Sequence, residues 1–318
     1  PSRPLLMPLT FSLAARLENL PLGSFAMNPT KIANALPQIR AALKLDGVTC
    51  YWNQYLEVQA LGGRVEWNSE GAVLVEPPRF DSVDDLQENT GSAEAILKSG
   101  GIPVAVEVLR RLRVMLKDEP ALMMSVTGPL KLAAQLSCTP EGGLLPAALV
   151  EFCAGIVATL SQHFVEAGAD QVFLSENAPR TDNAEKFEWW AALLEPVINV
   201  VRFYDALPVL LLDERLDSPF AWSILNRSWD CVICLSPSLG DQFSTPASGA
   251  HGLGLALPGT LFAETGNDQK KMLVGTRNIV DRVKPVLLTS STDIPANADI
   301  KQVASSLDHL REVHSPAR

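Results

Sequence analysis

Eight short apolar segments, each followed by a longer stretch, constrain the fold of this chain more than any other feature. The segments are rich in leucine or β-branched residues and predict strands at 5–10, 47–52, 122–127, 171–175, 208–212, 231–236, 252–257 and 285–290. A spacing of apolar residues near 3.6 predicts helices at 29–45, 102–116, 145–167, 184–204, 269–283 and 300–313. Strand followed by helix, repeated about eight times, predicts a (β/α)8 TIM barrel of the α/β class.

An open, doubly wound sheet is the main alternative to the barrel. Such a sheet more often carries a Gly-rich phosphate loop after an early strand, and neither G-x-G-x-x-G nor G-x-x-x-x-G-K-[ST] occurs here. A length of 318 residues is ordinary for a barrel. We therefore expect one domain over residues 1–318, with a small N-terminal hairpin at 64–78 that turns at 68–71.

Charge and hydropathy exclude several classes of partner. The formal net charge of −10 would repel a nucleic-acid backbone. No uninterrupted apolar run approaches the ~20 residues of a membrane helix, and the N-terminal residues do not resemble a signal peptide. We expect no nucleic acid and no membrane as partners, and a cytoplasmic location.

The five cysteines are an odd number and are scattered, mostly inside apolar runs, which predicts reduced and buried thiols. Cys231 and Cys234 form a C-x-x-C string on a predicted strand. Side chains three positions apart on a strand point to opposite faces. Core packing is therefore favoured over a metal or redox role for this pair.

Four sequence blocks occur in a familiar order along nearly the whole chain. Residues 45–62 form an Asp-led strand with a polar end, followed by Gln-Ala-Leu-Gly, and residues 125–133 are similar to a Gly-Pro-x-Thr-Leu block. Residues 166–170 contain Gly-Ala-Asp, and residues 293–295 are Asp-Ile-Pro. Together they resemble the uroporphyrinogen decarboxylase superfamily, including its cobalamin and coenzyme M methyltransferases. The resemblance implies a homodimer and one of two chemistries: metal-free decarboxylation of tetrapyrrole acetates, or zinc-assisted methyl transfer.

The resemblance also places residues of the decarboxylase site on this chain. Asn53 stands where the family's key Asp closes the second strand, and an amide cannot supply the charge of that carboxylate. Gln135 falls near the family's pocket Tyr, and Ser291 falls near its His. Arg16 matches the basic motif that binds carboxylates in the family.

The zinc ligands of the methyltransferases have no counterpart at the matching positions. In the methyltransferases that this chain resembles, the zinc ligands are a His-x-Cys pair after a mid-chain strand and a Cys after the last strand. This chain has Asp213-Glu-Arg215 and Thr289-Ser-Ser-Thr292 there. Because zinc needs several nitrogen or sulfur ligands in a tetrahedral set, we expect no metal and no cofactor.

In a barrel, the active site is built at the carboxyl ends of the strands. We predict Glu176 and Asp213 as an acid–base pair, with Asn53 as a third catalytic residue. The predicted substrate-binding residues are Arg16, Gln135, Asn177, Arg215, Ser291 and Asp293. The structural alternatives are that Glu176 caps a neighbouring helix and that 213–215 form a solvated charge cluster.

Three functions remain open at this point. The first is a metal-independent decarboxylase or lyase that acts on a carboxylated aromatic or tetrapyrrole-like small molecule. The second is a methyltransferase that works with a folate or corrinoid partner but without the usual zinc. The third is a non-catalytic binding protein that kept the barrel and lost the chemistry.

Overall fold

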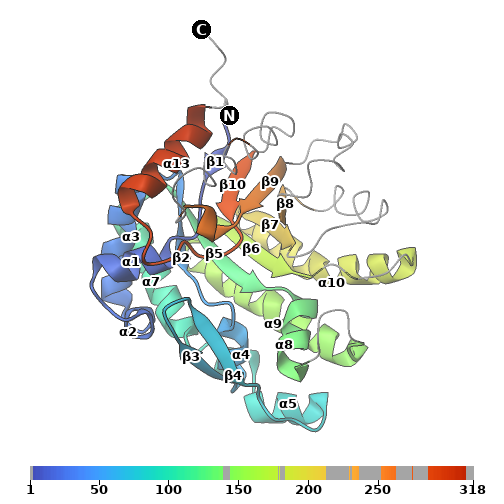
Figure 1. Cartoon of the computed structure of the whole chain (residues 1–318). Coiled ribbons are helices and arrows are strands. Elements are labelled where there is room, and N and C mark those ends of the chain that lie inside the picture. The colour runs from blue at the N-terminus through green and yellow to red at the C-terminus, as the bar shows by residue number, and fades with distance from the viewer. Residues whose placement is uncertain are drawn as a thin grey trace.

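Eight parallel strands form a nearly closed barrel with helices outside it (Figure 1). The computed structural model describes residues 3–138, 144–177, 179, 183–212, 229, 231–235, 252–262, 274 and 286–312. The strands follow one another in the order β1-β10-β9-β8-β7-β6-β5-β2. The predicted (β/α)8 TIM barrel is confirmed, and the open doubly wound sheet is wrong.

Each of the eight predicted strands is present. They are β1 (Leu5–Leu6), β2 (Gly47–Tyr51), β5 (Ala121–Thr127), β6 (Gln171–Glu176), β7 (Leu207–Leu212), β8 (Cys231–Leu235), β9 (Gly252–Leu257) and β10 (Leu287–Ser290). The strand β1 is shorter than predicted because, after Leu6, side chains of β10 take the place of some backbone partners in the hydrogen bonds between the two strands. The Leu9 N–H donates to Ser290 Oγ (2.9 Å), and the Thr289 hydroxyl donates to the Met7 carbonyl (2.8 Å).

The long helices agree with the sequence pattern. They are α3 (Pro29–Leu43), α7 (Ile102–Leu116), α9 (Ala147–Glu166), α10 (Ala184–Phe203) and α13 (Ile300–Glu312). Of the helix predicted at 269–283, only residue 274 is among the described residues, so this prediction is not tested. Short helices were not predicted, because one or two turns give little periodicity. These are α1 (Phe11–Leu17), α2 (Leu22–Ala26), α4 (Leu56–Ala60), α5 (Val83–Thr90), α6 (Ala93–Ile96), α8 (Pro129–Ser137) and the 3-10 turn η2 (Gly259–Phe262).

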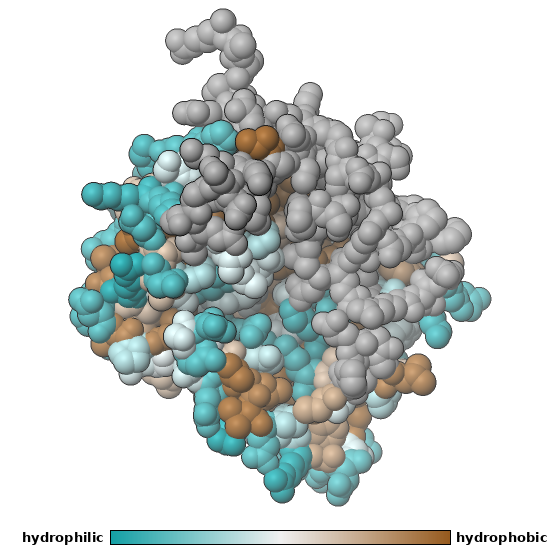
Figure 2. All heavy atoms as spheres, in the orientation of Figure 1, coloured by the Kyte–Doolittle hydropathy of each residue, from teal (hydrophilic) through white to brown (hydrophobic). Residues whose placement is uncertain are grey.

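The predicted hairpin is confirmed as β3 (Arg64–Trp67) and β4 (Ala72–Glu76), an antiparallel pair. Its turn is held by Asn68, whose side-chain oxygen accepts from the N–H groups of Glu70 (2.8 Å) and Gly71 (3.0 Å). The outer face carries exposed Val73 and Val75, which contribute to an apolar patch over the hairpin in Figure 2.

The apolar core has two layers. Alternate strand residues fill the barrel interior, and their neighbours pack under the helices. Tyr51 packs against Phe11 outside the barrel, whereas its neighbour Trp52 contacts both layers. Trp190 is fully buried under α10.

Helix α9 is long and apolar enough to cross a membrane by length and composition alone, although Glu151 interrupts its apolar run. Just over half (56%) of its most apolar window is buried inside the fold. The helix packs against α8, α10 and the strands β5 and β6. Burial in the outer core layer accounts for its apolar composition.

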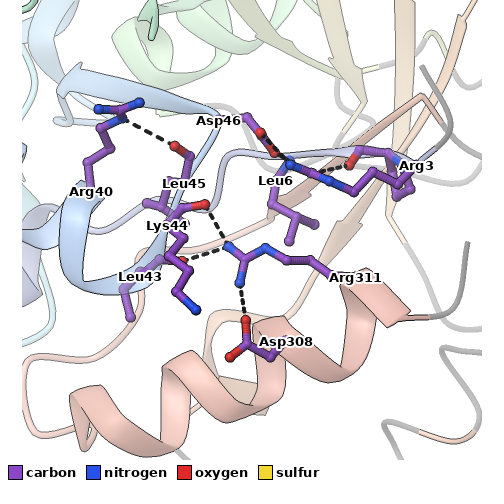
Figure 3. Close-up of polar contacts among 10 residues, drawn as sticks. Arg3, Leu6, Arg40, Leu43, Lys44, Leu45, Asp46, Asp308 and Arg311 are labelled. Carbon is purple, nitrogen blue, oxygen red and sulfur yellow. Dashed lines mark hydrogen bonds and ion pairs between the residues drawn. The ribbon is translucent and has the colours of Figure 1, made fainter. Parts of the chain in front are cut away.

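The seam between the first and second strands is closed by Asp46, which precedes β2 (Figure 3). Its N–H donates to the Leu6 carbonyl (3.1 Å), and its Oδ2 accepts from the Leu6 N–H (2.8 Å). Arg3 forms a two-pronged ion pair with the same carboxylate, at 2.7 and 2.8 Å. Burial raises the pKa of Asp46, but the hydrogen bonds from Arg3 and Leu6 outweigh it and hold the pKa below its ordinary value.

A second aspartate repeats this arrangement between β5 and β6. Asp170 precedes β6; its N–H donates to the Leu122 carbonyl (2.9 Å), and its Oδ2 accepts from the Leu122 N–H (2.7 Å). Arg113 pairs with Asp170 at 2.6 Å. An Asp before a strand, neutralised by an Arg, therefore fixes the register at two places in the barrel.

Helix α13 is tied to the same seam by Arg311. Its guanidinium donates to the carbonyls of Leu43 (2.6 Å) and Lys44 (2.7 Å) at the end of α3, and it pairs with Asp308 on α13 (Figure 3). The last helix of the chain is thus fixed beside the turn that leads into Asp46.

The substitution Asp46→Asn should lower the free energy of unfolding by about 1–3 kcal/mol, because it removes a charge-assisted pair at a partly buried seam. Urea denaturation at pH 7 measures this. Asp118→Asn is the matched control: Asp118 is almost fully exposed, at 3.5 Å from Arg113, and its loss should change stability by less than about 0.5 kcal/mol. The effect of Asp46→Asn should shrink as pH falls below the ordinary value of 3.8, where the unfolded carboxylate gains a proton, and should be lost as pH falls through the lower pKa of the folded state. An undiminished effect in acid would contradict the charge argument.

Candidate active site at the barrel mouth

Asn53 lies directly after β2, at the carboxyl end of the barrel. Its Oδ1 accepts from the Tyr55 N–H (2.9 Å), and its backbone carbonyl accepts from the Leu56 N–H (3.2 Å). The residue is 9% exposed, and its buried Nδ2 has no hydrogen-bond partner in the described part of the chain. Asn53 thus carries one buried amide donor that no described group satisfies.

Gln135, on α8, contacts the same loop. Its Nε2 donates to the Gln54 carbonyl (3.1 Å), whereas its Oε1 is buried without a partner. The Gln54 carbonyl and the Tyr55 N–H belong to one peptide group, so Asn53 and Gln135 hold its two edges. The structure therefore brings these two predicted residues together.

Glu57, on α4, is a site residue that the sequence analysis missed. It is 1% exposed; its Oε1 accepts from the Thr127 N–H (2.9 Å), and its Oε2 accepts from the Thr127 hydroxyl (2.7 Å). Burial raises its pKa above the ordinary value. The sequence feature that could have identified Glu57 is its position, an acidic residue one turn after the polar end of the second strand.

Lys131 was also missed. It lies in the first turn of α8, and its ammonium donates to Ser175 Oγ (2.7 Å) at the end of β6. Ser175 is two positions after Phe173, which lies in the barrel interior, so Ser175 faces the mouth. Lys131 also lowers the pKa values of Glu57 and Glu176 through its charge.

Glu176 caps the neighbouring helix α8, as the alternative to a catalytic role predicted. It is fully buried and accepts hydrogen bonds from the N–H groups of Leu130 (3.0 Å) and Lys131 (2.9 Å) in the first turn of α8. It also accepts from the N–H group of Asn177 (2.8 Å). Gly128 is required beside it, since a Cβ there would lie 2.5 Å from the Glu176 carboxyl carbon. Burial raises the pKa of Glu176 to about 7 against the opposing effect of these donors.

Asp293 caps α1 in the same way. It is partly buried; its Oδ2 accepts from the Ser12 N–H (2.7 Å), and burial raises its pKa to about 6. Arg16, also on α1, donates to the carbonyls of Ala296 (3.1 Å) and Ala298 (2.8 Å). The Ser291 N–H and hydroxyl donate to the Leu257 carbonyl, at 2.8 and 3.4 Å.

The predicted site residues thus fall into two groups. One lies at the ends of β2, β5 and β6 and contains Asn53, Gln135, Glu176 and Asn177; the other lies beside β10 and α1 and contains Arg16, Ser291 and Asp293. Asp213 and Arg215 lie outside the described residues. The acid–base pairing of Glu176 with Asp213 therefore stays a prediction.

Among the residues that the structure describes, no group of three or more His, Cys, Asp or Glu side chains is placed to hold a metal ion. Cys50, Cys153 and Cys231 are buried, reduced thiols, as predicted, whereas the thiol of Cys138 is exposed. Cys231 lies in the barrel interior, as core packing predicts, while the side chain of Cys234 is not among those described.

Comparison with known proteins identifies the family. The sequence profile of uroporphyrinogen decarboxylase (URO-D) matches residues 12–208, which is more than half of the chain and includes the ends of β2, β5 and β6. The chain belongs to the uroporphyrinogen decarboxylase family. The order of sequence blocks predicted this membership, and the family includes both decarboxylases and methyltransferases.

Solved structures share the fold of this URO-D family chain at low sequence identity. A methyltransferase from Methanosarcina mazei superposes with a TM-score of 0.78 at 15% identity, covering 98% of this chain and 94% of that one. A putative vitamin-B12 independent methionine synthase from Listeria monocytogenes gives a TM-score of 0.55 at 13% identity, covering 98% and 96%. No curated protein matches the sequence. At these identities the likeness establishes the barrel fold alone.

The substitution Glu176→Gln should remove part of the pH dependence of stability. The folded pKa of about 7 lies above the ordinary value of 4.5, so the native state keeps a proton that the unfolded chain has lost. This stabilising effect is complete below about pH 4.5 and disappears as pH rises through 7, a change of about 3 kcal/mol. Denaturation between pH 4.5 and 8 should show a shallower slope in the variant.

The matched control for this measurement is Glu195→Gln on the exposed side of α10. It should keep the slope of the wild-type protein. A Glu176→Gln variant with the full wild-type slope would contradict the assignment of the raised pKa to this carboxyl group.

Proposed function

We propose that this protein is a metal-independent, decarboxylase-like lyase that acts at the barrel mouth on a carboxylated aromatic small molecule. The observation that carries the proposal is the distribution of polar groups there. Glu57 and Glu176 are buried, Asp293 is partly buried, and each of these three carboxylates accepts hydrogen bonds from the protein. The amide of Asn53 presents a donor, and the ammonium of Lys131, which donates to Ser175, adds positive charge; both suit an anionic substrate.

A decarboxylation needs a bound carboxylate and a proton for the carbon that loses it. Lys131 and Ser175 supply positive charge and a hydroxyl near the substrate carboxylate. Burial raises the pKa of Glu57 above its ordinary value, which favours the protonated form, and the Thr127 hydroxyl lies 2.7 Å from its Oε2. In the proposed step, Thr127 gives its proton to the ring carbon as Glu57 gives its own to Thr127. The C–C bond then breaks, CO2 leaves, and the bonding electron pair returns to the ring.

Glu57→Gln should lower kcat by about 100-fold or more, because an amide cannot supply the proton. The amide oxygen can still accept a hydrogen bond from Thr127, so the melting temperature should change little. Glu70→Gln, in the exposed hairpin turn, is the matched control and should retain full activity. CO2 release from a panel of carboxylated aromatics is the assay. A Glu57→Gln enzyme as active as wild type would remove Glu57 from the mechanism.

Methyl transfer with a folate or corrinoid partner is the second candidate. It is favoured by the superposition on a methyltransferase over 94% of that chain, although the low identity supports only the fold. Methyl exchange with a methylated folate or corrinoid, with zinc analysis of the purified protein, distinguishes it from the lyase. Methyl exchange without CO2 release would replace the lyase proposal.

A non-catalytic binding role is the third outcome of these assays. Absence of both activities, with no ligand raising the melting temperature, would favour it. A cytoplasmic homodimer belongs to the same proposal, and light scattering gives the oligomeric state.

A further inference from the structure

The last two residues of β6 hold Lys131 at both of its ends. The backbone N–H of Lys131 donates to Glu176 Oε1 (2.9 Å), and its ammonium donates to Ser175 Oγ (2.7 Å). Because Ser175 and Glu176 are neighbours on a strand, their side chains point to opposite faces, Ser175 into the mouth and Glu176 toward α8. The Lys131 side chain therefore runs from the helix that Glu176 caps to the mouth where the proposed substrate carboxylate binds.

Glu176 is not placed to touch a ligand. Its side chain is fully buried, and its oxygens accept from the N–H groups of Leu130, Lys131 and Asn177. Gly128 also lies so close that a Cβ there would be 2.5 Å from the Glu176 carboxyl carbon. The carboxyl group is thus held in one position, and its effect on a substrate must pass through Lys131.

The groups around Glu176 determine when it is charged. Burial raises the pKa of Glu176 to about 7, and the positive charge of Lys131 opposes this shift. From α9, Cys153 also acts on Glu176, but burial raises the pKa of this thiol, so it stays uncharged. From β7, the neighbour in register is the apolar Leu212. Glu57, on α4, interacts with the same ammonium, so Lys131 lies between two buried carboxyl groups.

We propose, on the basis of the lyase function above, that Glu176 is a positioning residue whose charge governs the binding of the substrate carboxylate at Lys131. A neutral Glu176 caps α8 and holds Lys131 against Ser175 without adding negative charge beside the ammonium. An ionised Glu176 keeps the cap but repels an anionic substrate. Affinity for anions should therefore fall as pH rises through neutrality, and by linkage the binding of an anion should draw a proton onto Glu176.

Calorimetric titration with 1-naphthoate tests the proposal, and 1-naphthamide is its uncharged analogue. The wild-type protein should bind 1-naphthoate about tenfold more tightly at pH 6 than at pH 8, whereas the Kd of 1-naphthamide should not change. At pH 7, titrations in buffers of different ionisation enthalpy should show proton uptake with 1-naphthoate. Glu176→Gln resembles the protonated residue, so it should bind 1-naphthoate equally at both pH values and take up fewer protons.

Two further variants assign the effect. Lys131→Met should lose most of the affinity for 1-naphthoate at pH 6 and keep that for 1-naphthamide. Glu195→Gln, on the exposed side of α10, is the matched control and should keep the wild-type pH dependence. Melting temperatures at pH 6 establish that each variant is folded.

Four results would each overturn the proposal. They are a wild-type Kd that does not change between pH 6 and 8, a full pH dependence in Glu176→Gln, an unchanged affinity for 1-naphthoate in Lys131→Met, and no binding of 1-naphthoate at about 1 mM. The first of these needs no variant, so the proposal can be tested even if a substitution prevents folding.

The same titrations separate this proposal from the proposed function. CO2 release from the carboxylated aromatics with a KM that does not change between pH 6 and 8 would support the lyase and overturn the role of Glu176. Binding of 1-naphthoate that depends on pH in the wild-type protein but not in Glu176→Gln, without CO2 release, would support the role of Glu176 and contradict the lyase.

Discussion

The barrel depends on how its first and second strands are joined. Because β1 is only two residues long, Asp46 supplies through its backbone and side chain the hydrogen bonds to Leu6 that a longer ladder would provide. Arg3 neutralises the aspartate, and Arg311 fixes α13 beside the same turn. Closing this seam sets the position of β2 and hence of Asn53 at its far end. Asp170 shows the same solution between β5 and β6.

Acidic residues have a different task at the carboxyl end of the strands. Glu176 and Asp293 accept backbone N–H groups from the first turns of α8 and α1, so each connects a strand to a helix beside it. Burial raises the pKa of both groups, and the fold is therefore sensitive to pH through residues that also line the mouth. Both carboxylates accept backbone hydrogen bonds, while Asp293 Oδ1, Asn53 Nδ2 and Gln135 Oε1 are buried without a hydrogen-bond partner among the described residues.

The sequence predicted some parts of the candidate site better than others. The positions of Asn53 and Gln135 followed from the block order, because a strand end and the Gly-Pro turn are fixed points of the barrel. Glu57 and Lys131 were missed because their neighbours are decided by packing: α4 carries Glu57 against Thr127, and α8 carries Lys131 against Ser175. Those partners are about 45 to 70 residues away along the chain. The capping role of Glu176 was weighed as an alternative, but no sequence pattern could rank it above catalysis.

The sequence alone determined the family, the eight strands, the long helices and the hairpin, because these depend on local periodicity and on turn residues. The tertiary structure decided which polar groups meet across the mouth, because each contact joins elements that only barrel closure brings together. It also decided that the side chains of Asn53 and Gln135 hydrogen-bond to the same peptide group, and that Glu176 accepts hydrogen bonds at the N-terminus of α8. Satisfaction of buried hydrogen bonds is a property of the packed interior, and for this reason the chain order could not reveal it.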